Sequence, residues 1–190
     1  MKDTPIIIGY DAKRIVRNGT GLGNYSRTLI KNIIHTKDLR FTLRLYAPDQ
    51  GKEAFRQQIK ETKLVYYVYP HGKKGNIAKA WWRFSGINKD LINDGVQLYH
   101  GLSGELPKGI HDTGIKTLVT IHDLIFLRFP KYYNWLDVQL YKYKFQLTCK
   151  EADRIIAISE CTKRDIIEFG GVDPSKITVV YQDCEQAFKE

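Results

Sequence analysis

The fold class follows from residues 5–12, Pro-Ile-Ile-Ile-Gly-Tyr-Asp-Ala, and from the glycine-rich residues 19–23, Gly-Thr-Gly-Leu-Gly. In the first stretch apolar residues follow one another without alternation, which predicts a strand buried on both faces. After the glycines, apolar residues recur every three or four positions from Leu22 to Ile34, which predicts a helix that ends near Thr36. The sequence therefore opens with a strand, a glycine-rich loop and a helix.

The alternation of strand and helix continues along the chain. We predict further strands at residues 40–47, 63–69, 96–99, 115–121, 154–158 and 177–181. We predict further helices at residues 50–61, 76–93 and 134–151, and one that opens at the N-cap Ser159, with Thr162 three positions on, and stops at Gly170-Gly171. This alternation is typical of α/β proteins, so we expect a doubly wound, mainly parallel Rossmann-like sheet.

The composition fits a globular protein. Hydrophobic residues make up 43% of the 190 residues and charged residues 27%. The longest clearly apolar run, residues 64–69, is far shorter than the roughly 18 residues that span a bilayer. No signal-peptide pattern precedes the first strand, so we expect a cytoplasmic protein. The cysteines Cys149, Cys161 and Cys184 lack CxxC spacing, which argues against a disulfide framework or a zinc site.

Positive charge is concentrated in the first half of the chain. Residues 1–95 hold 18 basic and 8 acidic side chains, whereas residues 96–190 hold 12 and 13. A basic half can attract nucleic acid, anionic lipid or a phosphate-bearing substrate, or can be a solvated surface without a dedicated partner. We do not expect nucleic acid, because the basic residues are scattered rather than gathered in a recognition motif.

Candidate ligand-binding residues follow the strands directly. Ligands of open parallel sheets bind at the carboxyl ends of the strands, where residues 11–23, 100–105, 122–126 and 159–163 are expected to meet. Glycines at the mouth of a helix let backbone N–H groups approach an anion, although a flexible turn explains them equally well. Their spacing is neither the GxGxxG dinucleotide pattern nor a GxxxxGK phosphate loop.

His122 and Asp123 come directly after the predicted strand at 115–121. Successive residues of an extended chain face opposite ways, so we expect one of them to contact ligand and the other to brace the loop, unless the histidine is structural. His100 with Ser103 is a weaker candidate, because residues 101–105 do not form the GxSxG motif of hydrolases. The histidines form no HxxxH pair, so we expect no metal site.

Trp81 and Trp82 are adjacent on the helix predicted at 76–93, where Ile77 is expected to face the sheet. Neighbours on a helix differ by about 100°, so one tryptophan must point elsewhere. With basic residues nearby, such as Arg83, an exposed aromatic suits an anionic membrane or a partner protein. A well-packed tryptophan at a domain boundary is the alternative interpretation.

Several of these segments match a known pattern in order and spacing. They are residues 8–12, 19–25, 99–100, the run Val119-Thr120-Ile121-His122-Asp123-Leu124-Ile125-Phe126, and residues 152–165 and 172–181. Together they resemble the N-terminal domain of the retaining glycosyltransferases of family 4, which have the two-domain architecture called GT-B. The resemblance covers nearly the whole chain.

The resemblance implies transfer of a hexosyl group from a nucleotide-sugar donor to a glycan or lipid-linked acceptor, commonly a growing polysaccharide, with no metal or other cofactor. It implies that His122 and Asp123 form the catalytic pair, in which His122 contacts the transferred sugar and Asp123 supports its loop. It further implies substrate binding by the residues that follow the other strands: Gly21, Gly23, Asn24, His100 and Ser159.

By the same resemblance, residues 1–181 form the acceptor-side domain and residues 182–190 begin the linker to an absent C-terminal domain. Residues Gln182-Asp183 depart from the usual Asn-Gly of that linker. Such a chain is half an enzyme and is expected to be inactive without the other half. The alternative is a non-catalytic GT-B-like module that binds an anionic membrane, peripherally at the inner face of the cell membrane, or a partner protein.

Overall fold

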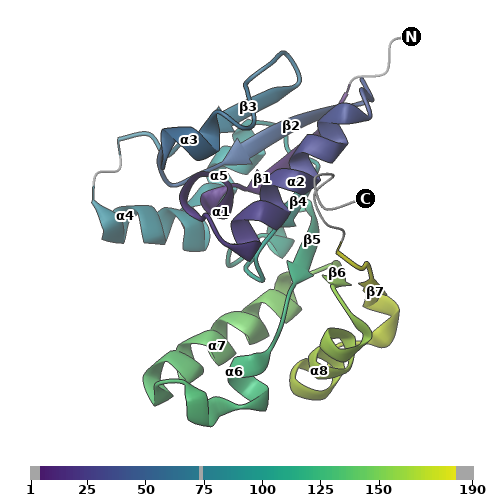
Figure 1. Cartoon of the computed structure of the whole chain (residues 1–190). Helices are drawn as coiled ribbons and strands as arrows, with labels where there is room; N and C mark the ends of the chain where they lie inside the picture. Colours follow the sequence, from purple (N-terminus) through teal and green to yellow (C-terminus); the bar gives the residue numbers. More distant parts are fainter. Residues whose placement is uncertain (1–4, 73–74, 183–190) are drawn as a thin grey trace.

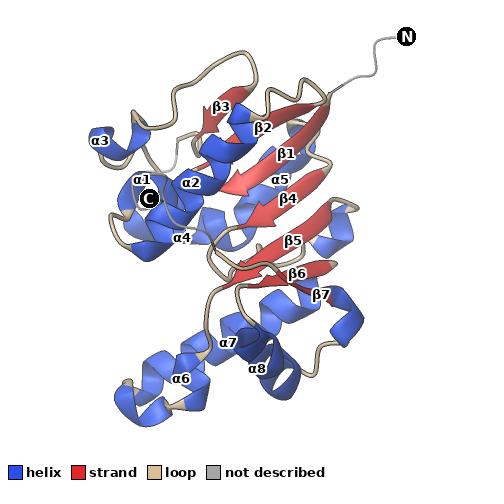
Figure 2. Ribbon diagram, turned by 45° about the vertical axis from the view of Figure 1, so that its right-hand side comes forward, coloured by secondary structure: helices blue, strands red, loops and turns tan. Residues whose placement is uncertain are grey.

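A computed structural model describes residues 5–72 and 75–182 of the chain. Its centre is a parallel sheet of seven strands in the order β3-β2-β1-β4-β5-β6-β7, with helices on both faces (Figures 1 and 2). The strands are β1 (Ile6–Asp11), β2 (Phe41–Tyr46), β3 (Val65–Val68), β4 (Leu98–Gly101), β5 (Lys116–Ile121), β6 (Arg154–Ala157) and β7 (Ile177–Val179). The predicted doubly wound, parallel Rossmann-like sheet is confirmed.

The first predicted strand, β1, lies inside the sheet between β2 and β4. Its residue Tyr10 pairs in register with Leu45 of β2 and with His100 of β4. Burial on both faces explains why its apolar residues run on without alternating. The carboxyl ends of β1, β4, β5 and β6 therefore reach the same edge of the sheet.

Helices cover the sheet from either side. They are α1 (Lys13–Arg17), α2 (Gly21–His35), α3 (Glu53–Arg56), α4 (Asn76–Trp81), α5 (Ile87–Asn93), α6 (Ile125–Arg128), α7 (Trp135–Glu151) and α8 (Glu160–Gly170). Single turns occur at η2 (His111–Thr113), η3 (Pro130–Tyr132) and η4 (Pro174–Lys176), and a π-helical segment, η1 (Trp82–Gly86), joins α4 to α5.

Two apolar cores form, one on each face of the sheet. Leu45 and Tyr46 are neighbours on β2, so their side chains point to opposite faces, and they belong to different cores. The first core packs β1 and β2 against α1 and α2 through residues such as Ile30. The second packs the other face against α5, α7 and α8 through residues such as Leu91 and Phe145.

Three helix predictions need correction. Only Glu53–Arg56 of the helix predicted at 50–61 is helical, because Gly51 takes a left-handed φ of 59° and Lys52 N–H bonds to the Val16 carbonyl of the neighbouring helix α1. The predicted loop after β1 contains the short helix α1, which buries two apolar side chains in the core. The helix predicted at 76–93 is interrupted by η1, and Ile77 is 88% exposed instead of facing the sheet.

The predictions for the tryptophan pair and for the two ends of α8 are confirmed. Trp82 is buried at 1% exposure while its neighbour Trp81 is 62% exposed. The Ser159 side chain accepts the N–H of Thr162 as the N-cap of α8, and Gly171 ends that helix with a left-handed φ of 59°. Cys149 and Cys161 are free thiols, and Cys184 lies outside the described residues. Within the described ranges, no helix has both the length and the apolar character needed to cross a membrane.

Candidate functional site

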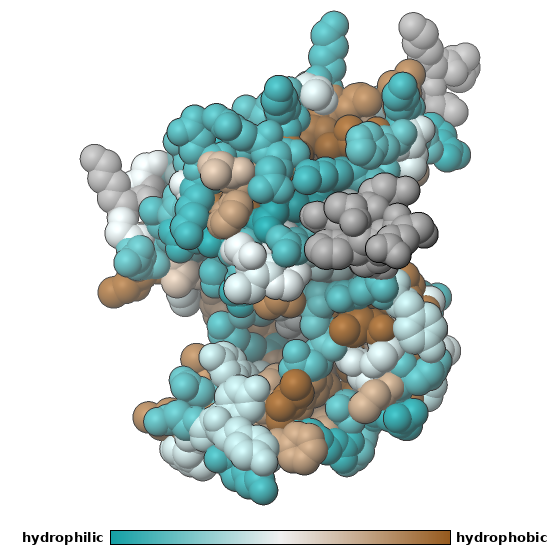
Figure 3. Space-filling model, viewed as in Figure 1, coloured by the Kyte–Doolittle hydropathy of each residue, from teal (hydrophilic) through white to brown (hydrophobic). Residues whose placement is uncertain are grey.

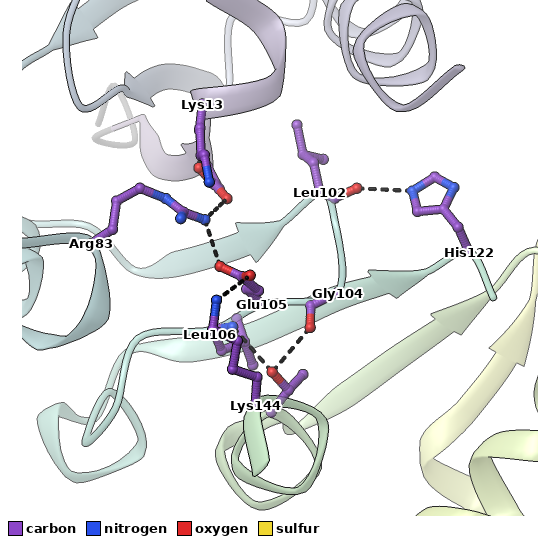
Figure 4. Close-up of polar contacts among 10 residues, drawn as sticks. Lys13, Arg83, Leu102, Gly104, Glu105, Leu106, His122 and Lys144 are labelled. Atoms are coloured by element: carbon purple, nitrogen blue, oxygen red, sulfur yellow. Dashed lines mark hydrogen bonds and ion pairs between the residues drawn. The ribbon is translucent and has the colours of Figure 1, made fainter. Parts of the chain in front are cut away.

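The loops that follow β1, β4, β5 and β6 converge at the carboxyl edge of the sheet, as the sequence predicted. They bring together the start of α2, the Leu102 to Glu105 loop, His122 and the start of α8. Figure 4 shows the His122 ring turned toward the Leu102 carbonyl at this edge.

His122 is fixed through both ring nitrogens. Its Nε2 donates a hydrogen bond of 3.0 Å to the Leu102 carbonyl, which leaves Nδ1 as an acceptor. Gln182 donates its side-chain amide to that Nδ1 at 2.8 Å. Burial lowers the pKa of His122 below its ordinary value, against the opposing effect of the Leu102 hydrogen bond. The imidazole is therefore neutral at neutral pH, with Nδ1 as its acceptor.

Two more elements hold the His122 loop. The ring of Tyr25 from α2 meets the imidazole edge-on, with the ring centroids 4.7 Å apart. On the other side, Thr162 Oγ1 donates to the His122 backbone carbonyl at 3.1 Å, and Ser159 Oγ lies 3.0 Å from that same hydroxyl. Ser159 thus reaches the His122 main chain through Thr162.

Asp123 has a different environment from its neighbour. It is exposed, and its Oδ1 accepts the backbone N–H of Ile125 at 3.2 Å, in the first turn of α6. This hydrogen bond shapes the loop after β5. The two adjacent residues do face different surroundings, as their extended backbone predicted.

His100 lies below the edge, inside the protein. It is 5% exposed, and its Nε2 lies 2.9 Å from Thr120 Oγ1, which is 3.1 Å from the Tyr25 hydroxyl. Burial lowers the pKa of His100 to about 4, so it is neutral at physiological pH. These contacts connect His100 to the ring that packs on His122 and do not place it on the open surface.

Gly21 and Gly23 of the glycine-rich loop have different surroundings. A side chain on Gly21 would meet open space, whereas a Cβ on Gly23 would lie 1.9 Å from the Asn18 carbonyl oxygen. Close packing thus explains Gly23 without a ligand. Asn18 Oδ1 accepts the N–H groups of Thr20 and Gly23, and Asn24 Oδ1 accepts a hydrogen bond from Arg27.

The N-terminus of α2 is open to a ligand. Within the described part of the chain, the N–H groups of Gly21 and Leu22 have no hydrogen-bond acceptor. Helix N-termini carry partial positive charge and bind anions. Leu22 and His122 line the same pocket of about 240 Å³, together with Arg14, Ser103 and Asp123.

A second pocket, of about 540 Å³, adjoins the first, and Glu105 and Lys144 line both. Arg83 Nη2 bonds to Asp11 at 2.8 Å and to Glu105 at 2.9 Å, and Lys144 bonds to Glu105 at 3.1 Å (Figure 4). Burial raises the pKa of Glu105, but the charges of Arg83 and Lys144 outweigh it and lower the pKa to about 2.

Sequence reasoning missed this ion network. Arg83 appeared only as a charge beside the tryptophans, Asp11 had no assigned partner, and Glu105 and Lys144 were not singled out. The acidic residue at the end of β1 was the available signal, because a buried carboxylate at a strand end needs a cation. Among the residues that the structure describes, no group of three or more His, Cys, Asp or Glu side chains is placed to hold a metal ion.

The fold and the site define a Rossmann-like α/β domain with its ligand pockets at the carboxyl edge of the sheet. The sequence profile of Glycosyltransferase Family 4 matches residues 20–182, most of the chain. The chain therefore belongs to Glycosyltransferase Family 4. No curated protein matches the sequence significantly.

Solved glycosyltransferases share the fold. HepE from Anabaena, solved in complex with UDP and glucose, is 12% identical with a TM-score of 0.57, and the alignment covers 95% of this chain and 45% of HepE. A glycosyltransferase from Rickettsia africae is 16% identical with a TM-score of 0.52, covering 95% of this chain and 43% of that one. This chain thus spans less than half the length of either structure.

Proposed function

We propose that this chain is the acceptor-side half of a retaining glycosyltransferase that transfers a hexosyl group from a nucleotide-sugar donor to a glycan or lipid-linked acceptor. Family membership over residues 20–182 supports sugar transfer. The observation that carries the proposal is the shared pocket of His122 and the open N-terminus of α2.

The two parts of this pocket suit the two demands of the reaction. Breaking a sugar-phosphate bond builds negative charge on the departing diphosphate, and N–H dipoles with a cation nearby stabilise such charge. The N–H groups of Gly21 and Leu22 supply the dipoles, and Arg14, which lines the same pocket, supplies a cation. These groups are thus suited to the donor diphosphate or to an anionic group of the acceptor.

His122 contacts the transferred sugar in this proposal. Because its Nε2–H is held by the Leu102 carbonyl, its Nδ1 can only accept a hydrogen bond, and a sugar hydroxyl is a suitable donor. That hydroxyl would take the place of the Gln182 amide. Asp123, Ser159 and His100 act on this site through the loop and ring contacts described above, while Gly23 and Asn24 shape the start of α2.

The remaining groups needed for a full catalytic cycle belong, in this proposal, to a C-terminal nucleotide-binding domain, without a metal ion. Residues 182–190 would begin the linker to it, and only Gln182 of that segment lies within the described residues. We therefore expect the 190-residue chain by itself not to complete sugar transfer.

The test is sugar transfer by the chain, alone and mixed with a separately expressed C-terminal half, from a panel of nucleotide-sugars. We expect transfer only with the mixture and with a subset of the donors. A folded, associated pair that transfers no sugar from any donor would overturn the proposal.

A second candidate function, attachment to an anionic membrane, is favoured by one surface. Figure 3 shows pale aromatic and brown apolar side chains over α6 and the start of α7. We call this the aromatic surface, and its members are at least 40% exposed: Phe129, Tyr132, Tyr133, Trp135, Leu136, Leu140 and Tyr143. Tyrosine and tryptophan favour the membrane interface, and the exposed Lys131 and Lys142 add positive charge. The Trp81-Trp82 pair offers a smaller exposed aromatic surface, since Trp82 is buried.

Sedimentation with phosphatidylglycerol vesicles at low and high salt tests this second function. We expect salt-sensitive binding that the double variant Trp135→Ser/Leu136→Ser loses and the matched variant Trp81→Ser keeps. Absence of binding by the parent chain, or equal binding by both variants, would contradict it.

A further inference from the structure

The larger pocket at the carboxyl edge contains an excess of positive charge. Five cations line it: Lys13, Arg17, Lys79, Arg83 and Lys144. Three carboxylates bond to these cations: Asp11, Glu105 and Asp49. Two positive charges of this group are therefore not balanced by the carboxylates that bond to it.

The carboxylates are already committed to their partners. Asp11, 3% exposed, bonds to Arg83, and Glu105 bonds to both Arg83 and Lys144. Asp49 pairs with Arg17 and, at 2.8 Å, with Lys79. These pairs hold the cations of the pocket in place before any ligand arrives.

Lys13 is the exception among the five. Within the described residues its ammonium forms no hydrogen bond or ion pair, although the side chain is half-buried in the wall of the pocket. Burial and the neighbouring Arg83 lower the pKa of Lys13. An anion from solution would relieve both effects, because it would give the ammonium a partner and screen it from Arg83.

The same pocket has an aromatic wall. Trp81 and Phe84 line it with their ring centroids 6.0 Å apart, and the Trp81 indole is mostly exposed. A flat aromatic face beside fixed polar groups suits a ring-shaped ligand such as a sugar.

We propose that this pocket binds a phosphorylated saccharide, with the phosphate at the Lys13 ammonium and a sugar ring against Trp81. The inference rests on the proposed function, since this ligand would be the acceptor. Glu105 and Lys144 line both pockets, so an acceptor seated here extends across that shared wall toward His122. The phosphate can come from a soluble sugar phosphate or from a lipid-linked sugar, which offer the same chemistry to Lys13.

Isothermal titration of the 190-residue chain with glucose 1-phosphate, inorganic phosphate and glucose tests the proposal. We expect glucose 1-phosphate to bind and neutral glucose to bind at least about tenfold more weakly, as the loss of one charge-assisted hydrogen bond implies. We expect Lys13→Gln to weaken glucose 1-phosphate binding by about tenfold and Lys13→Arg to retain it. Trp81→Ala should weaken glucose 1-phosphate binding but leave phosphate binding unchanged.

The matched control is Lys116→Gln, because Lys116 is exposed at the opposite end of the sheet. Circular dichroism checks that each variant is folded, and Lys13→Gln removes no side-chain hydrogen bond from the described structure. Displacement of glucose 1-phosphate by vesicles that contain a polyprenyl phosphate sugar assigns the phosphate to a lipid-linked acceptor. If such vesicles leave glucose 1-phosphate bound, the phosphate belongs to a soluble acceptor.

Equal binding by the parent chain and Lys13→Gln, or glucose binding as tight as glucose 1-phosphate binding, would overturn the proposal. Neither result touches the proposed sugar transfer, which is measured separately with the paired halves. Conversely, a pair that transfers no sugar would overturn the proposed function, while the binding measurements would still decide whether this pocket binds glucose 1-phosphate.

Discussion

The Nε2 of His122 and the backbone carbonyl of Leu102 are joined by a hydrogen bond of 3.0 Å, which ties the end of β5 to the loop after β4. This contact decides which ring nitrogen carries the proton. It leaves Nδ1 facing Gln182 as an acceptor, and burial keeps the ring neutral. A chemical role for His122 therefore depends on its uncharged form.

Sugar transfer should fall as the solution becomes acidic. Burial lowers the pKa of His122 below its ordinary value of 6.5, so the ring is uncharged at neutral pH and gains a proton only below that value. Protonation would turn Nδ1 from an acceptor into a donor and remove its bond to the sugar hydroxyl. The pH profile of kcat for the paired halves measures this. A rate that holds steady or rises as the pH falls from 7.5 to 5 would contradict it.

Buried His100 should make the fold sensitive to acid. Its pKa is about 4 in the folded chain against 6.5 ordinarily, so the unfolded chain takes up the proton first as the pH falls. The stabilisation is complete above pH 6.5 and is lost progressively down to about pH 4, by up to roughly 3 kcal/mol. Urea unfolding of the parent, His100→Gln and the control His111→Gln measures the effect. An unchanged slope of stability against pH in His100→Gln would count against it.

Two alanine substitutions in the glycine-rich loop should have opposite effects. Gly23→Ala would press a methyl group onto the Asn18 carbonyl and destabilise the fold by roughly 1–3 kcal/mol. Gly21→Ala meets open space in the first turn of α2 and should keep or raise stability by up to about 1 kcal/mol, while transfer falls because the methyl stands at the mouth of the site. Thermal unfolding and transfer rates check both. Equal stability of the two variants would contradict this account of the loop.

The N-cap of α8 should contribute about 1 kcal/mol to the free energy of unfolding. Ser159→Ala removes the acceptor of the Thr162 N–H, whereas Ser159→Asp replaces it with another good cap. We expect urea unfolding to show a loss for the alanine variant and recovery for the aspartate variant. If the alanine variant unfolds like the parent, the contact contributes nothing to stability.

Much of the fold could be predicted from the sequence because strands buried on both faces leave an unambiguous pattern. Residues 8–12 and the segment 115–121 are examples, and the parallel order then brings their ends to one edge. The secondary-structure predictions are wrong where tertiary contacts override the local sequence pattern. Residues 50–61 have helical spacing, but Gly51 turns the chain and Lys52 bonds to Val16 instead.

The site was only partly predictable for a similar reason. A histidine directly after a buried strand is visible in the sequence, whereas its partners Leu102, Tyr25 and Gln182 are distant in sequence, and no local pattern pairs them with it. Arg83 reaches Asp11 from 72 positions away, across the interrupted helix that contains η1. Only the folded chain brings such pairs together.

The rate of sugar transfer by His122→Ala, paired with the C-terminal half, tests the central claim most directly. His111→Ala is the matched control, because His111 is an exposed histidine in η2, which precedes β5, whereas His122 follows the end of that strand. The account predicts that kcat falls by about 100-fold or more in His122→Ala, with a folded protein, and stays unchanged in His111→Ala. A His122→Ala chain that transfers sugar at the parent rate would contradict it.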